Sequence, residues 1–269
     1  MPTVQVNDVT LHYESVGDGS ETLLFSHGYL MNKTMFNGQI DALQKQFRCI
    51  AYDHRGHGES EVTKDGYALD NLVTDAIKFI EELAIGPVHF VGMSTGGFVG
   101  MRIALRRPDL LKSLVLMDTS AEEESAKTLK KNNLLLWVVK NIGWFPVTGQ
   151  VMSIIFHDTF LKDTTRKQEV KKWRNIITGQ DKKGLVPFGK GIFARGSVLE
   201  KLSNLQIPTA VIIGEFDVAT PPIHSKRLVE TIPNANLYTI ADAGHSAAIE
   251  KPIEVTQALK DFYKKVGIV

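Results

Sequence analysis

Cysteine is nearly absent from this chain, which has a single one, Cys49, among its 269 residues. One thiol excludes a disulfide within the chain. Cys49 lies in the apolar-rich segment 47–52, where we expect it to be a buried strand residue. The sequence is therefore typical of a protein in a reducing compartment, and we expect it to be cytoplasmic and unprocessed.

The sequence also lacks long apolar runs and an excess of charge of either sign. Its longest apolar run, residues 134–139, is far shorter than the roughly 20 residues that span a bilayer, and residues 1–6 do not resemble a signal sequence. The chain has 31 Lys and Arg against 30 Asp and Glu, without a basic run interleaved with aromatic residues. This balance argues against a nucleic-acid partner.

Short apolar strands alternate with amphipathic helices over most of the chain. The alternating segments 3–5 and 10–14 flank Asn7 and Asp8, which predicts a hairpin at the edge of a sheet. Further strands are expected at residues 22–26, 48–52, 88–91, 113–117, 207–214 and 237–240, and helices at 34–46, 69–83, 222–232 and 252–265 and directly after Ser94. This order predicts the α/β class, with a mostly parallel central sheet and helices on both faces.

The alternation stops between residues 121 and 200. This stretch shows no convincing buried strand, and its glycines and prolines divide it into several predicted helices. We therefore expect a core domain of residues 1–120 and 201–269 and a helical insertion of residues 121–200. The insertion has 14 Lys and Arg against 8 Asp and Glu, which solvated helix faces explain; attraction of an anionic substrate is the alternative.

The chain is organised around the segment 88–98, in which an apolar run ends at Gly92, presents Ser94 and continues as a helix. The pattern Gly-x-Ser-x-Gly-Gly is typical of a strained strand-to-helix turn that exposes a nucleophilic hydroxyl. Strand and helix can cross so closely because the flanking positions carry almost no side chain. A dinucleotide site with Asp118 as ribose-binding acid is the competing interpretation, but the glycine spacing does not fit one.

A serine hydroxyl is a weak nucleophile at neutral pH and needs a base, which a third group must orient. His245 follows the last predicted strand and Asp217 follows the strand before it. Both therefore lie at strand carboxyl ends, where the ligand sites of open α/β sheets form. We predict that Ser94, Asp217 and His245 are the catalytic residues, with Glu215 and Asp118 as alternatives to Asp217.

Two backbone N–H groups are predicted to bind the oxyanion that forms beside the nucleophile. Thr95 opens the helix after the serine, so its N–H is unsatisfied and lies at the positive end of the helix dipole. Tyr29 follows an earlier strand and supplies the second donor. His54 and His57 share one loop, where a metal site is the alternative to a structural role, but no Cys or carboxylate cluster completes such a site.

With these residues identified, the chain resembles the α/β-hydrolase fold family over nearly its whole length. The chain order Ser, Asp, His is the order of that family, and the loop 53–60 and a helical cap at the insertion are similar to its members. Within the family, the sequence resembles small serine esterases, lactonases and perhydrolases. Its Gly-Met-Ser-Thr-Gly-Gly segment is similar to cofactor-free haloperoxidases, whereas the loop 53–60 and Thr220-Pro221-Pro222 are similar to enol-lactone hydrolases.

The residues and the resemblance together imply a serine hydrolase that cleaves a carboxylic ester or lactone through an acyl-enzyme intermediate. We expect a small-molecule substrate, no metal or other cofactor, no nucleic-acid partner and no membrane span. A non-catalytic or single-turnover ligand receptor on the same fold and a perhydrolase side activity are the alternatives.

The insertion is further predicted to be a cap that covers Ser94. Its apolar segments carry more apolar surface than a few helices can bury among themselves, so they should cover the mouth of the site. Trp137, Trp144, Phe145 and His157 are the candidates for lining the substrate pocket, and packing inside the cap is the alternative for each.

Overall fold

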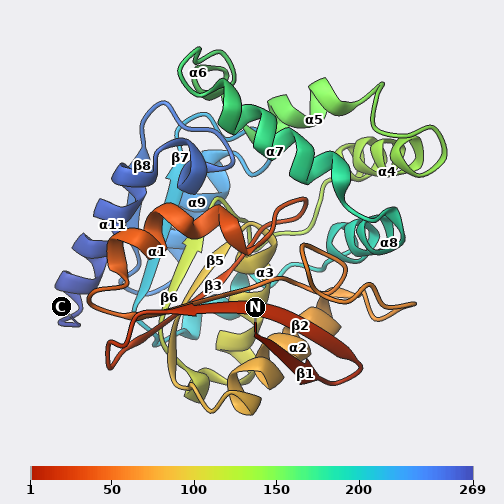
Figure 1. The fold of residues 1–269 in the computed structure, drawn as a ribbon. Helices are drawn as coiled ribbons and strands as arrows, with labels where there is room; N and C mark the ends of the chain where they lie inside the picture. The colour runs from red at the N-terminus through yellow and green to blue at the C-terminus, as the bar shows by residue number, and fades with distance from the viewer. Residues whose placement is uncertain (1, 269) are drawn as a thin grey trace.

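The computed structural model describes residues 2–268 and contains an eight-stranded sheet (Figure 1). Its strands are β1 (Thr3–Val6), β2 (Val9–Val16), β3 (Thr22–Ser26), β4 (Arg48–Tyr52), β5 (Val88–Met93), β6 (Leu111–Met117), β7 (Thr209–Gly214) and β8 (Asn236–Ile240), which lie in the order β1-β2-β4-β3-β5-β6-β7-β8. β2 is antiparallel to β1 and β4, and all other neighbours are parallel. The predicted edge hairpin and mostly parallel sheet are confirmed.

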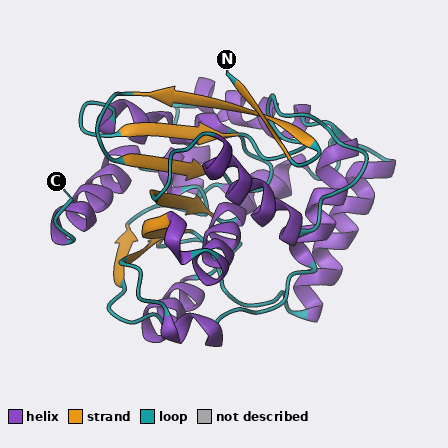
Figure 2. Ribbon diagram, turned by 90° about the horizontal axis from the view of Figure 1, so that it is seen from below, coloured by secondary structure: helices purple, strands orange, loops and turns teal. Residues whose placement is uncertain are grey.

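Helices cover both faces of this sheet (Figure 2). They are α1 (Asn37–Leu43), α2 (Leu69–Glu82), α3 (Thr95–Arg106), α9 (Pro222–Thr231), α10 (Ala247–Glu250) and α11 (Pro252–Lys265), together with the 3-10 helices η1 (Lys33–Phe36), η2 (Pro108–Leu110) and η3 (Glu200–Asn204). α1 packs against α11, and α2 packs against α3. The two pairs lie on opposite faces, because their buried side chains belong to two separate apolar clusters.

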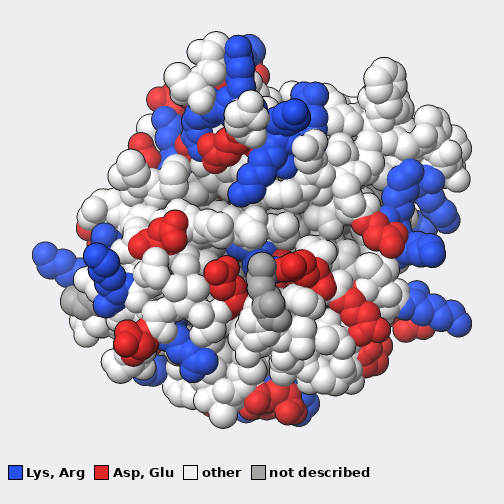
Figure 3. All heavy atoms as spheres, in the orientation of Figure 1, with Lys and Arg blue, Asp and Glu red and all other residues white. Residues whose placement is uncertain are grey.

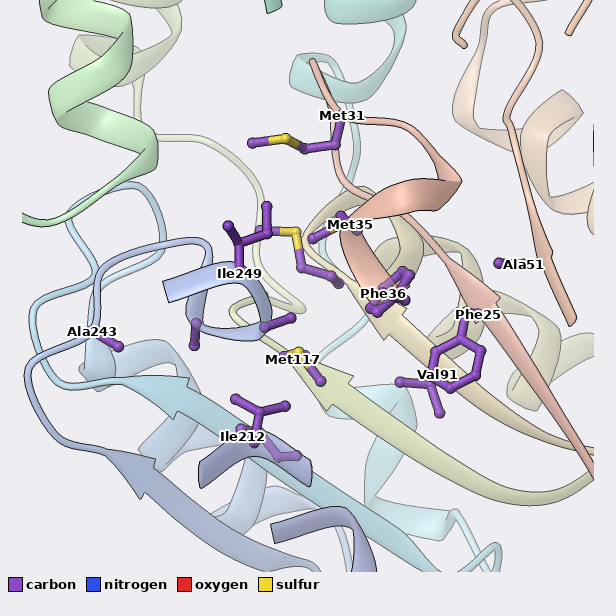
Figure 4. Packing of buried hydrophobic residues seen from close by; sticks show 14 of the residues in the cluster. Phe25, Met31, Met35, Phe36, Ala51, Val91, Met117, Ile212, Ala243 and Ile249 are labelled. Atoms are coloured by element: carbon purple, nitrogen blue, oxygen red, sulfur yellow. The ribbon is translucent and has the colours of Figure 1, made fainter. Parts of the chain in front are cut away.

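The sheet is buried on both sides, because neighbouring residues of each strand point to opposite faces. Every residue of β5 is buried, with Phe90 in the cluster beside α2 and α3 and Val91 in the cluster on the other face. Figure 4 shows this second cluster, to which Phe25 and Met117 contribute. Cys49 is a free buried thiol in the same cluster, as predicted, and burial raises its pKa to about 12.

The segment between β6 and β7 consists of helices, and we call it the cap. It consists of α4 (Ala126–Asn141), α5 (Thr148–Ile155), α6 (Asp158–Leu161), α7 (Lys167–Gly179) and α8 (Lys182–Phe193), which lie at the top and right of Figure 1 in green to teal. Side chains of this cap and of the strand-to-helix turn after β5 line one cavity. Within residues 2–268, no helix is both long and apolar enough to cross a membrane.

Candidate active site

Ser94 occupies the turn between β5 and α3. Its backbone has φ 49° and ψ −108°, a conformation that residues with a side chain adopt only where the surrounding structure enforces it. Glycine makes the turn possible, because a Cβ at Gly92 would collide with the carbonyl oxygen of Gly96, and one at Gly97 would lie 2.5 Å from Thr119 Oγ1. The strained strand-to-helix turn that the sequence predicts is therefore present.

Ser94, His245 and Asp217 form a chain of hydrogen bonds, although they are far apart in the sequence. His245 Nε2 lies 3.1 Å from Ser94 Oγ, and His245 Nδ1 lies 2.9 Å from Asp217 Oδ2. Because a carboxylate oxygen only accepts, Nδ1 carries the proton and Nε2 is free to accept from the serine hydroxyl. All three side chains are buried. The structure thus brings together the three residues that the sequence singles out.

Asp217 is held in place by the turn that follows it. Its Oδ1 accepts from the N–H groups of Ala219 at 2.8 Å and Thr220 at 2.9 Å, and its Oδ2 accepts from the Thr220 hydroxyl at 2.7 Å. Glu215, the first alternative acid, is exposed and accepts from the N–H of Asp242 at 3.2 Å. Asp217 and not Glu215 is therefore the acid that contacts the imidazole.

Asp118, the second alternative acid, is buried near the same site but contacts backbone groups. Its Oδ1 accepts from the Gly214 N–H at 2.8 Å, and its Oδ2 accepts from the Ala247 N–H at 3.3 Å. Burial raises the pKa of Asp118 well above its ordinary value, and the nearby charge of Asp217 adds to the effect. Asp118 therefore ties the end of β7 to the start of α10.

Glu250 is a further buried carboxylate beside the site, and no sequence pattern marks it. It accepts from the N–H groups of Gly244 at 3.1 Å and Ser246 at 3.2 Å, the two neighbours of His245. It also accepts from the N–H of His157, in the cap, at 2.9 Å. Burial raises the pKa of Glu250 above its ordinary value. Glu250 thus fixes the loop that carries His245 and connects this loop to the cap.

Two N–H groups next to Ser94 are free to bind an anion. Within residues 2–268, neither the Tyr29 N–H nor the Thr95 N–H has a hydrogen-bond acceptor. A Cβ at Gly28 would lie 3.3 Å from Ser94 Cβ, so the loop that carries Tyr29 runs directly against the serine. Thr95 is the first residue of α3, where the helix dipole favours negative charge. Both predicted donors therefore lie next to the nucleophile candidate.

The Tyr29 side chain connects this loop to the cap. Its ring stacks on Phe188 of α8, with ring centroids 5.7 Å apart and planes inclined by 6°, and its hydroxyl donates to the carbonyl oxygen of Leu185 at 2.9 Å. Burial raises the pKa of the Tyr29 hydroxyl, which keeps it protonated as a donor. The sequence pattern points only to the Tyr29 backbone, because a contact with residues so distant along the chain depends on the folded arrangement.

His27, His54 and His57 form a buried group next to the Tyr29 loop. His27 Nε2 accepts from the His54 N–H at 2.9 Å, His54 Nε2 lies 3.1 Å from Ser26 Oγ, and the His57 ring lies 4.3 Å from that of Phe188. Burial lowers the pKa of all three imidazoles, to about 3 for His57. Among residues 2–268, no set of three or more His, Cys, Asp or Glu side chains is arranged to hold a metal ion.

A cavity of about 910 Å³ is lined by Ser94, His245 and the cap. The cap contributes apolar side chains to its wall, namely Leu135, Leu136, Val139, Trp144, Val151 and Ile155. Charged side chains of both signs line another part, namely Glu122, Glu123, Glu124, Lys127, Lys131, Arg195 and Arg227. The cavity is large enough for a small organic substrate, and most pockets of this size hold their ligand through such apolar walls.

Of the four cap residues predicted to line the pocket, Trp144 does so. The prediction is corrected for Trp137 and Phe145, which are 56% and 98% exposed and do not border the cavity. Helical periodicity explains Trp137, because Leu136 and Val139 take the buried face of α4 and leave Trp137 on the opposite face. Phe145 lies in the turn after α4 and faces solvent.

The prediction is also corrected for His157, which lies outside the cavity lining. Its side chain accepts from the Thr159 N–H as the N-cap of α6, and its ring stacks on Phe216 with centroids 4.4 Å apart. The backbone N–H of His157 donates to Glu250, which also binds the loop that carries His245. His157 therefore lies where the cap meets that loop.

The model of the alpha/beta hydrolase fold family matches residues 21–252. The chain is 27% identical to 3-oxoadipate enol-lactonase 2 from Acinetobacter baylyi, over 98% of this chain and 96% of the relative. Its structure is similar to a thermophilic esterase from Thermogutta terrifontis, with a TM-score of 0.91, 26% identity and 99% of each chain covered. It is also similar to the enol-lactonase from Burkholderia xenovorans, with a TM-score of 0.90, 26% identity and 98% and 100% of the chains covered. Because the family match extends over most of its length, the chain belongs to the α/β-hydrolase fold family.

Proposed function

We propose that this protein is a serine hydrolase that cleaves a carboxylic ester or lactone through an acyl-enzyme intermediate. The observation that carries the proposal is the hydrogen-bonded chain from Ser94 Oγ through His245 to Asp217, in which Ser94 and His245 line the cavity. The enol-lactonase and esterase relatives support the choice of ester or lactone bonds.

In the first half of the proposed reaction, Ser94 Oγ attacks the substrate carbonyl carbon and His245 Nε2 takes the hydroxyl proton. The carbonyl oxygen becomes an oxyanion, which the free N–H groups of Tyr29 and Thr95 stabilise. Asp217 keeps the imidazole in the required tautomer and stabilises its positive charge. The tetrahedral intermediate then collapses, the bond to the alkoxy group breaks, and His245 returns the proton to the leaving oxygen.

In the second half, a water molecule attacks the acyl group on Ser94 while His245 Nε2 takes one of its protons. Collapse of this second intermediate releases the carboxylic acid, and the proton returns to Ser94 Oγ. With an ester, the alcohol leaves after the first half. With a lactone, the alcohol stays in the same molecule, so the product is a hydroxy acid.

The proposal is tested with Ser94→Ala on a p-nitrophenyl ester such as the butyrate. Loss of a triad nucleophile lowers turnover by about four to six powers of ten in other serine hydrolases, and we expect a loss of this order. Ser203→Ala, which changes an exposed serine outside the cavity, should retain wild-type turnover and controls for the loss of a hydroxyl.

A fluorophosphonate should add its phosphonyl group to wild type and to Ser203→Ala, with loss of fluoride and the serine proton, but should not add it to Ser94→Ala. The melting temperatures of the three proteins without the reagent should be the same. Sustained multiple turnover by wild type separates a hydrolase from a single-turnover receptor. Turnover by Ser94→Ala within tenfold of wild type contradicts the proposal.

A further inference from the structure

Large apolar side chains are exposed together on the outer side of the cap. Leu134 and Trp137 on α4 are 62% and 56% exposed, and Ile142 and Phe145 in the turn after α4 are 64% and 98% exposed. We call these four residues the cap patch. The uncharged surface that bulges at the upper right of Figure 3 lies over this part of the cap. Exposed apolar residues grouped in this way mark contact surfaces, whereas isolated ones need no explanation.

The cap patch is held in place by an ordered backbone. Leu134 and Trp137 are one helical turn apart, so they share one face of α4. The N–H groups of Ile142 and Gly143 both donate to the carbonyl oxygen of Val138, at 2.8 and 2.9 Å, which closes the helix. The following turn, which begins at Trp144, is closed by the Val147 N–H, which donates to the Trp144 carbonyl oxygen at 2.9 Å. Phe145 therefore projects from a structured turn.

Lysines lie close to the cap patch, and the segment that carries the patch has no acid. Lys130 and Lys140 on α4 are exposed and do not border the cavity, and they lie one helical turn from Leu134 and Trp137. On α8, the exposed Lys182 has its Nζ 3.9 Å from where a Cβ of Gly143 would be. No Asp or Glu occurs between Ser125 and His157, and none of these lysines pairs with a carboxylate within residues 2–268.

We propose that the cap patch binds to the surface of an anionic phospholipid bilayer. Trp, Phe, Leu and Ile side chains insert at the boundary between headgroups and acyl chains, and lysines around them are attracted to anionic headgroups. A second copy of this chain fits less well. Twofold symmetry would place the same patch on both subunits, so the lysines around one patch would face the lysines around the other.

Bilayer binding through the cap patch would place the cavity next to the lipid. Trp144 lines the cavity, and its neighbour Phe145 belongs to the cap patch. The same α4 presents Leu135 and Leu136 to the cavity. Apolar esters that concentrate in a bilayer would then reach the cavity without first crossing water. The proposed binding goes beyond the hydrolase function and does not depend on it.

The test is co-sedimentation with vesicles of phosphatidylcholine alone and of phosphatidylcholine mixed with phosphatidylglycerol. Wild type should sediment with the mixed vesicles, far less with the neutral ones, and dissociate from both in about 1 M NaCl, where charges are screened within about 3 Å. Lys130→Ala and Lys140→Ala should each weaken binding about fivefold, the effect of about 1 kcal/mol per lysine near such a surface. Phe145→Ser and Trp137→Ser should reduce binding to mixed vesicles further.

The matched controls change an exposed apolar residue and an exposed lysine outside the cap. Ile253→Ser and Lys264→Ala on α11, which are also exposed, should bind vesicles like wild type. Hydrolysis of a soluble p-nitrophenyl ester should be unchanged in the Phe145 and Trp137 variants, which do not border the cavity. Absence of binding to mixed vesicles, or equal binding by the Phe145 and Ile253 variants, overturns the proposal. A vesicle-free dimer that Phe145→Ser dissociates would also overturn it, because a second copy would then occupy the patch.

Discussion

Asp217 and Glu215 follow β7 only two residues apart, yet their surroundings differ. Asp217 accepts hydrogen bonds from His245 and from the turn after it, whereas Glu215 is exposed. We expect Asp217→Asn to lower kcat by about 10⁴, because an amide that donates to Nδ1 leaves the imidazole in the wrong tautomer. Glu215→Gln should stay within about twofold of wild type. Steady-state kinetics on one ester would check both, and the reverse order of effects would reassign the acid.

Glu250 holds the loop that carries His245, so changing its carboxylate should displace the imidazole. Glu250→Gln keeps one acceptor oxygen but adds N–H donors that would face the N–H groups of Gly244, Ser246 and His157. The loop that carries His245 should shift, and a shift of about 1 Å can lower turnover about 100-fold. We expect a lower kcat with little change in KM.

The matched control for this prediction is Glu254→Gln, which changes an exposed acid in the first turn of α11. It should retain wild-type kinetics. If Glu250→Gln retains wild-type kcat while its melting temperature falls, the carboxylate is structural and does not position the histidine.

Local chemistry explains which site residues the sequence could predict. Ser94 is recognisable because its turn requires small neighbours, and His245 and Asp217 are recognisable because they follow strands that end at the same edge of the sheet. Glu250 carries no comparable signal. Its partners are backbone N–H groups of a distant loop, and nothing in the sequence around it shows that its charge will be buried.

At the scale of elements, α4 shows why the cap was harder to predict. Residues 134–139 are all apolar, so the sequence predicts a helix but does not show which face is buried. In the structure Leu136 and Val139 are buried, and Leu134 and Trp137 face solvent. A uniformly apolar segment acquires an orientation only from the elements that pack against it, here mainly α8.

The neighbours Trp144 and Phe145 give a sharp test of this orientation. Trp144→Ala removes a side chain from the cavity wall and so enlarges the cavity. The preferred acyl chain should therefore become longer, as measured on p-nitrophenyl esters from acetate to palmitate. Each methylene in an apolar pocket is worth about 1–3 kcal/mol, so the shift should be graded. Phe145→Ala should leave the chain-length profile unchanged, since Phe145 does not border the cavity. An unchanged profile in Trp144→Ala would contradict a role of Trp144 in acyl selection.

At the scale of the whole molecule, the alternation of strands and helices was sufficient to predict the α/β class and the parallel sheet. The end of β5 and the span of α11 also agree closely with prediction. The order of strands was not predictable in the same way. β4 lies between β2 and β3, and apolar periodicity marks a strand as buried without specifying its neighbours. Which cap side chains meet the Tyr29 loop depends on the same long-range arrangement.

The three buried imidazoles make the stability of the whole fold depend on pH. An unfolded histidine binds a proton below about pH 6.5, whereas burial lowers the pKa of His27, His54 and His57, to about 3 for His57. Between these values the unfolded state binds more protons than the folded state. The folded state therefore loses stability relative to the unfolded state as the pH falls below about 6.5. The loss is about 1.4 kcal/mol per pH unit for a histidine that is unprotonated in the folded state and protonated in the unfolded state.

His57→Phe isolates one of these contributions, because it keeps a ring against Phe188 and removes Nε2, a buried atom without a partner in residues 2–268. Urea unfolding should give parallel stabilities for wild type and variant above about pH 7. At about pH 5 the free energy of unfolding of the variant should have risen by about 2 kcal/mol relative to wild type. This is the stability that wild type loses over the roughly 1.5 pH units below 6.5, where its unfolded state binds a proton at His57 and its folded state does not. Taking the difference between the two proteins cancels the carboxylates that titrate in the same range. A difference that stays constant from pH 7 to pH 5 would show that His57 is protonated in the folded protein or is reached by water.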